Sequence, residues 1–134
     1  MPVRSLNSSV FKWPDRSEVD HAVRDWAEIA VNSREGIIKL GYFGSYARGD
    51  WGVGSDLDLV VIVDHATEPF ERRSLTWDLS PLPVPSELLV YTLTEWQLLQ
   101  KKGGRFARTL EQETVWVYEA PSRKPNVTTR ESNP

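Results

Sequence analysis

The stretch DLDLVVIVD, residues 56–64, constrains the fold of this 134-residue chain more than any other segment. Successive side chains of a β-strand point to opposite faces, so Asp56 and Asp58 share one face. The other face is apolar and consists of Leu57, Leu59, Val61 and Val63. Aspartate is depleted in strands, and two adjacent carboxylates repel each other and lose hydration unless a cation compensates. The pattern predicts a core strand with a cation-binding edge; the alternative is a solvated strand face.

A Gly-Ser pair, Gly44 and Ser45, stands ten residues before Asp56. Glycine lets the backbone approach a phosphate closely, the start of a helix favours anions, and Ser45 adds a hydroxyl donor. Magnesium prefers oxygen ligands and takes part of its shell from substrate phosphates. By composition, this spacing should arise by chance in only about a few of every thousand chains of this size. Together the two motifs indicate metal-assisted chemistry on a nucleotide.

The combined motif resembles the signature of the minimal nucleotidyltransferases of the DNA polymerase β-like superfamily, and the resemblance covers roughly residues 17–119. It implies an α+β fold with a short mixed sheet and helices packed mainly on one face. It also implies two Mg²⁺ ions held by Asp56 and Asp58, and a nucleoside triphosphate bound by Gly44 and Ser45. Arg48, inside the motif, could approach the triphosphate or serve as a surface ion-pair arginine.

In that superfamily a third carboxylate on a later strand completes the metal cage. The matching segment here is VPSELLVYT, in which Glu87 replaces the usual aspartate. Strand alternation places Glu87, Leu89 and Tyr91 on one face. By the resemblance, we expect Glu87 to hold one ion and to help remove the acceptor's proton. The alternative is a residue at the rim of the site.

Composition excludes several classes of protein. The formal net charge is −3, which argues against stable binding of long nucleic acids. The chain has no cysteine, so disulfides and thiolate metal sites are excluded. It shows neither a signal-peptide core nor a run of about 18 apolar residues, so we expect no membrane segment and a cytoplasmic location. Trp13, Trp51 and Trp77 are predicted either to form a partner surface or to pack on the core.

We expect an irregular segment at 1–16, a nucleotidyltransferase domain at 17–119 and a disordered tail at 120–134. Thr94 is the predicted N-cap of the helix over 95–102. Basic residues at the end of this helix either bind phosphate or an acidic partner, or simply complement the helix dipole: Lys101, Lys102 and Arg105. The expected strands cover 37–43, 56–63, 87–92 and 114–119. The other expected helical segments are 17 to 32–36, 46–48, 69–77 and 105–112.

The acceptor is inferred from the resemblance alone. Relatives that modify small drugs generally carry an additional helical domain, whereas this chain ends about two elements after the third carboxylate, so we expect another protein to present the acceptor. Small members of the family often resemble the antitoxin of HEPN/MNT toxin-antitoxin systems, which attaches AMP to a tyrosine of its HEPN ribonuclease partner. We therefore expect an antitoxin that transfers AMP from ATP. The alternatives are a small-molecule nucleotidyltransferase completed by a partner subunit and a non-catalytic toxin-binding module.

Overall fold

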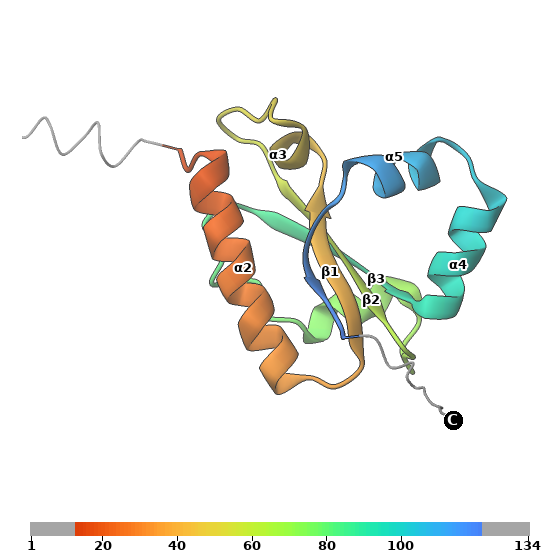
Figure 1. Cartoon of the computed structure of the whole chain (residues 1–134). Helices are drawn as coiled ribbons and strands as arrows, with labels where there is room; N and C mark the ends of the chain where they lie inside the picture. The colour runs from red at the N-terminus through yellow and green to blue at the C-terminus, as the bar shows by residue number, and fades with distance from the viewer. Residues whose placement is uncertain (1–12, 122–134) are drawn as a thin grey trace, which may run out of the picture.

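A mixed four-stranded sheet forms the centre of the computed structural model, which describes residues 13–121 (Figure 1). Strand order is β3-β2-β1-β4; β1 is antiparallel to β2 and β4, and β2 is parallel to β3. The strands are β1 (Ile37–Phe43), β2 (Leu57–Val63), β3 (Ser86–Thr92) and β4 (Val115–Glu119). The α+β class and the mixed sheet are confirmed. Most of the expected terminal segments, namely residues 1–12 and 122–134, lies outside the described part.

The helical elements surround this sheet on two sides (Figure 1). They are α2 (Arg16–Ser33), α3 (Ser45–Arg48), the 3₁₀ helix η1 (Phe70–Thr76), α4 (Leu93–Lys102) and α5 (Arg105–Glu113). Each expected element is present, with its ends within about two residues of the prediction. None of the helices in the described part of the chain combines the length and apolar character needed to cross a bilayer.

The main core lies between α2 and one face of the sheet. Asp15 caps α2 and forms a capping box with Glu18, which fixes where the helix begins. An apolar stripe at helical spacing then faces the strands: Val19, Val23, Trp26, Ala27 and Ala30. The apolar face of β2 packs here, as predicted, because alternate residues of that strand belong to the same buried cluster.

The opposite face of the sheet carries a smaller core. Val60 and Ile62 are buried although they alternate with the residues that face α2. α4 and α5 lie on this side of the sheet in Figure 1, and each of them contributes to the cover. Tyr91 and Trp116 both lie edge-on or tilted against Trp96 of α4, with ring centroids 5.9 and 5.8 Å apart. This face is therefore only partly closed by helices, and its remaining edge holds the candidate site.

The predicted cap of α4 was wrong by two residues. Thr92, the last residue of β3, accepts a hydrogen bond from the Glu95 backbone N–H, and the Glu95 side chain accepts one from the Thr92 backbone N–H. Thr94 therefore lies inside the first turn rather than ahead of it. The spacing Thr-x-x-Glu was the correct signal, because the acidic partner of a capping box is the third residue after the N-cap.

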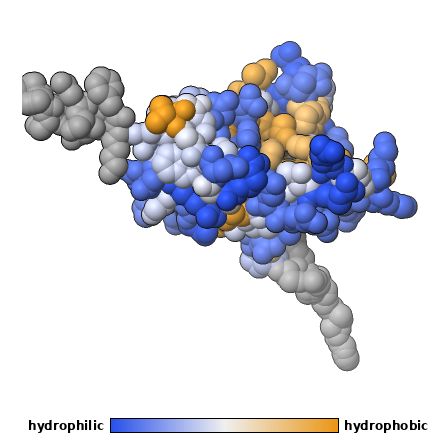
Figure 2. Space-filling view, turned by 90° about the horizontal axis from the view of Figure 1, so that it is seen from above, coloured by the Kyte–Doolittle hydropathy of each residue, from blue (hydrophilic) through white to orange (hydrophobic). Residues whose placement is uncertain are grey.

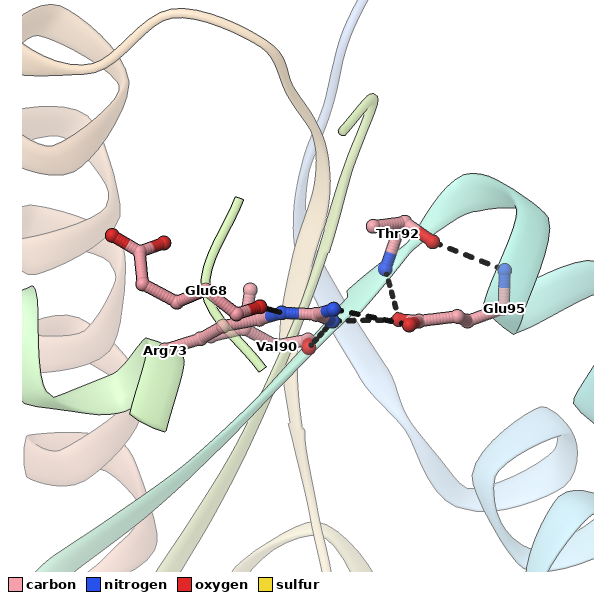
Figure 3. A network of polar contacts seen from close by, with 5 residues as sticks. All are labelled: Glu68, Arg73, Val90, Thr92 and Glu95. Atoms are coloured by element: carbon pink, nitrogen blue, oxygen red, sulfur yellow. Dashed lines mark hydrogen bonds and ion pairs between the residues drawn. The ribbon is translucent and has the colours of Figure 1, made fainter. Parts of the chain in front are cut away.

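A buried arginine ties η1 to β3 and α4 (Figure 3). Arg73 is only 8% exposed, and its guanidinium donates to Glu95 through two nitrogens, at 2.6 and 3.0 Å. It also donates to the backbone carbonyls of Val90 (3.0 Å) and Glu68 (2.8 Å). The network holds β3, the strand that carries Glu87, against its neighbours.

Candidate functional site

Two predicted carboxylates meet at one edge of the sheet. Asp58 of β2 is the direct register partner of Glu87 on the parallel strand β3. Their neighbours Leu59 and Leu88 are also partners, and both are buried in the core on the α2 side. Because strand side chains alternate, Asp58 and Glu87 point together to the other face. The sheet register therefore places Asp58 and Glu87 on the same face of the sheet, as predicted.

Asp56 lies immediately before β2 and is exposed, whereas Asp58 is half-buried. The two are separated by Leu57, which is fully buried in the core. Strand alternation therefore keeps Asp56 on the side of Asp58. Asp58 therefore has Glu87 beside it on the neighbouring strand and Asp56 two residues before it in the chain.

The Gly-Ser turn approaches the same carboxylate. Gly44 has a φ of 82°, and a Cβ atom at this position would collide with Oδ2 of Asp58. Only glycine tolerates both the backbone angle and the close approach. Gly44 leads directly into α3, whose first residue is the half-buried Ser45. The first amides of α3 therefore start beside the Asp58 carboxylate.

The electrostatics of Asp58 reflect this crowding. Partial burial raises the pKa of its carboxyl, and the nearby charges of Glu87 and Asp56 raise it further, while Arg48 opposes the shift. Glu87 and Asp56 thus place negative charge beside Asp58 in addition to the effect of burial. A bound cation would reverse this cost.

The donor set suits a divalent cation, because carboxylate oxygens are the ligands that Mg²⁺ prefers. Among residues 13–121, no group of three histidine, aspartate or glutamate side chains lies close enough together to form a complete metal site. Asp58, flanked by Asp56 and Glu87, is the position with the excess negative charge that a cation would neutralise. The three-carboxylate cage stays a prediction.

Arg48 is engaged in ion pairs. Its guanidinium lies 3.0 Å from Asp50 and 3.3 Å from Glu113 of α5. Its side chain is 45% exposed, so these pairs are solvated and each contributes little to stability. These pairs engage two of its three guanidinium nitrogens, Nε and Nη1. The position of Arg48 is therefore compatible with both predicted roles, a contact to the triphosphate and a surface ion pair.

An aromatic group anchors α3 and the loop that leads to Asp56. Tyr46 is fully buried, its ring stacks on Trp51 at 5.5 Å, and its hydroxyl accepts a hydrogen bond from Trp13 at 2.7 Å. Trp13, Trp51 and Trp77 all pack against the main core. The core interpretation of these tryptophans is therefore confirmed, and two of them brace the Gly-Ser turn.

No local pattern indicated that α5 would border the site. Glu113, near its C-terminal end, pairs with Arg48, and Phe106, in its first turn, lies edge-on to Phe43 with ring centroids 6.1 Å apart. Phe43 is the register partner of Asp58 and precedes Gly44. These contacts join residues more than 60 positions apart, which local patterns cannot reveal.

Comparison with known proteins identifies the family of the chain. The family model described as "Nucleotidyltransferase domain" matches residues 25–117, and the chain belongs to this family. The comparison with curated proteins gave no match.

Two solved structures share the fold at low sequence identity. A Sulfolobus solfataricus protein assigned as a nucleotidyltransferase is 17% identical with a TM-score of 0.56, over 78% of this chain and 83% of that one. A toxin-antitoxin structure with AMP-PNP is 15% identical with a TM-score of 0.53, over 72% of this chain and 73% of that one. At these identities the likeness establishes the fold alone.

Proposed function

We propose that this protein is a metal-dependent nucleotidyltransferase that transfers AMP from ATP to a tyrosine hydroxyl of a HEPN-type toxin and acts as its antitoxin. The observation that carries the transferase assignment is the meeting of Asp58, its partner Glu87 and the Gly44 turn at one edge of the sheet. The family match supports nucleotidyl transfer. The partner and the nucleotide are supported by analogy with the similar toxin-antitoxin structure with AMP-PNP.

In this proposal the chain's own residues bind and orient the triphosphate. The first amides of α3 and the Ser45 hydroxyl would donate to the phosphates, since donors at a helix start favour anions. Asp56 and Asp58 would hold the divalent ions, and Glu87 would complete the set and accept the proton of the attacking hydroxyl. Arg48 would stabilise the phosphates after leaving Asp50 or Glu113.

Bound magnesium would supply charge neutralisation at the α-phosphate and the leaving pyrophosphate. The new bond joins the acceptor oxygen to the α-phosphorus, and the bond to the β-phosphate oxygen breaks. The acceptor proton moves to the Glu87 carboxylate. Glutamate is one methylene longer than aspartate, and its reach decides whether this proton transfer is direct, because misplacement by ~1 Å can cost on the order of a hundredfold in rate.

The test is a labelling experiment with α-³²P-ATP and Mg²⁺. The purified chain is incubated alone, with the protein encoded next to it, and with a panel of small hydroxyl metabolites. Label on a tyrosine of the neighbouring protein supports the proposal. Label on a metabolite would instead assign a small-molecule transferase. Tight association with the neighbour without any label would assign a non-catalytic binding module.

Ser45→Ala should raise KM for ATP on the order of tenfold with a smaller change in kcat, because a hydrogen bond to a charged phosphate contributes about 1.5–3 kcal/mol. Steady-state rates at varied ATP measure both constants. Ser33→Ala, at the far end of α2, serves as the matched control, since its hydroxyl donates only to the helix carbonyls of Ile29 and Ala30. An unchanged KM in Ser45→Ala would remove Ser45 from the nucleotide site.

A further inference from the structure

α5 forms a wall beside the Asp58 edge of the sheet. Ala107 and Leu110 are buried at 2% and 0% exposure, which anchors the inner face of the helix. Phe106 and Glu113 flank these two positions at helical spacing and therefore point to the same side. Glu113 reaches Arg48 of α3, and Phe106 reaches Phe43 of β1. The helix is thus fixed against both elements that flank the Gly-Ser turn.

The ring of Phe106 is held by a contact with Phe43 and is still partly exposed to solvent. It is 44% exposed, although Ala107 next to it in the helix is buried. Its contact with Phe43 is T-shaped, at an interplanar angle of 76°, so Phe43 can cover at most one face of the Phe106 ring. Phe43 lies directly opposite Asp58 in the antiparallel pair of β1 and β2, where facing side chains are about 5 Å apart at Cβ. An aromatic face is therefore available about one side chain away from the catalytic carboxylate.

Two arginines lie next to Phe106 along α5. Arg105 and Arg108 are exposed, and no carboxylate of residues 13–121 lies within 4.0 Å of their charged groups. Figure 2 looks onto the end of the molecule where α3 and α5 lie, and it shows apolar surface on the α5 side set among hydrophilic residues. A ligand that combines a flat apolar ring with negative charge fits this combination better than an apolar peptide does.

We infer that Phe106 stacks against the nucleobase of the bound nucleoside triphosphate. This inference rests on the proposed nucleotidyl transfer and adds where the base lies. The triphosphate lies at the start of α3 beside Asp58, and the base extends toward α5, where the Phe106 ring packs against Phe43. Stacking is tolerant of base identity because every base presents a π-face. Phe106 is therefore an affinity residue for nucleosides rather than a reader of base edges.

The experiment compares binding of ATP and of tripolyphosphate, each with Mg²⁺, by calorimetry on the full chain. Phe106→Ala should weaken ATP binding on the order of tenfold, as expected for one stacked base, and leave tripolyphosphate binding unchanged. Phe106→Trp should restore ATP binding to within about twofold. Ile29→Ala is the matched control: Ile29 is an exposed apolar helix residue on α2, which covers the opposite face of the sheet, and its loss should affect neither ligand.

Each of the following results would overturn the inference. Equal weakening of ATP and tripolyphosphate in Phe106→Ala would mean that Phe106 only supports the fold of the site. Unchanged ATP binding with reduced transfer to the acceptor would assign the ring to the acceptor instead. Wild-type protein that binds no nucleotide would remove the proposed function itself, whereas magnesium-dependent ATP binding that is indifferent to Phe106 would remove this inference alone.

Discussion

Asp58→Asn is expected to lower the rate of AMP transfer by roughly a thousandfold or more. Asp58 is the central carboxylate of the site, since Glu87 is its register partner and Gly44 lies against it. In the proposed mechanism its loss removes a ligand of the ions that neutralise the reacting phosphates, an effect of several kcal/mol, and each 1.36 kcal/mol is a factor of ten in rate. Initial rates of label incorporation from α-³²P-ATP measure the effect.

The same substitution should leave the fold at least as stable as before. Burial, with the charges of Glu87 and Asp56, raises the pKa of the Asp58 carboxyl. A carboxyl whose pKa is higher in the folded state binds its proton more tightly when folded, so its charged form costs stability above that pKa. The cost is relieved as pH falls through the folded pKa. Asparagine is neutral at every pH, and the variant should therefore unfold at or above the wild-type temperature at pH 7.

Asp64→Asn is the matched control. Asp64 follows β2 at its other end and also lies against a glycine with positive φ, Gly36, where a Cβ atom would collide with its carboxylate. It thus reproduces the local backbone environment of Asp58 without a register partner such as Glu87. Full activity in Asp64→Asn beside lost activity in Asp58→Asn is the expected pattern. Equal activity of Asp58→Asn and wild type would refute the site.

The part of the site that the sequence could predict is the part set by local periodicity. Every second residue of β2 and β3 is apolar and packs in the core on the α2 side. Alternation therefore places Asp58 and Glu87, which are register partners, on the faces of their strands that point away from α2. A role for Gly44 was predicted because glycine lets the backbone approach a phosphate closely. The structure adds a second reason for glycine here, since a Cβ atom would collide with the Asp58 side chain.

The parts that could not be predicted depend on distant contacts. Arg48 pairs with Asp50 two residues away, but also with Glu113, whose position depends on how α5 packs. In the sequence, Phe106 cannot be distinguished from an ordinary surface phenylalanine, because its contact with Phe43 depends on how α5 packs. Arg73, in a short polar helix, gave no sign of burial, since its partners lie on another strand and another helix. No periodic pattern encodes such pairings.

Arg73→Met is expected to lower the free energy of unfolding by about 3 kcal/mol, which corresponds to a fall in melting temperature on the order of 10 °C for a domain of this size. The substitution removes the arginine donor from the Val90 carbonyl and from the Glu95 carboxylate, which keeps only the Thr92 backbone N–H of the network. Glu95 is 40% exposed, so water recovers part of the loss, and the estimate lies at the lower end of the range for broken buried pairs. Urea unfolding at pH 7 measures it.

The same network makes the free energy of unfolding depend on pH in the acidic range. Hydrogen bonds from Arg73, with further ones from Thr92, lower the pKa of Glu95 to about 2, against an ordinary value of 4.5. A carboxyl with a depressed pKa contributes stability that is fully present above its unfolded pKa and is lost as pH falls toward its folded pKa. The wild-type protein should therefore lose this contribution between about pH 4.5 and pH 2, and Arg73→Met should lose much less over the same interval.

Arg72→Met supplies the comparison, because Arg72 is the exposed neighbour of Arg73 in the same 3₁₀ helix. It carries the same loss of charge and the same new side chain without the buried contacts shown in Figure 3. Its urea midpoint should stay close to that of the wild type, since exposed arginines contribute little to stability. Coincident midpoints for the two variants would mean that the link from η1 to β3 and α4 does not stabilise the strand that carries Glu87.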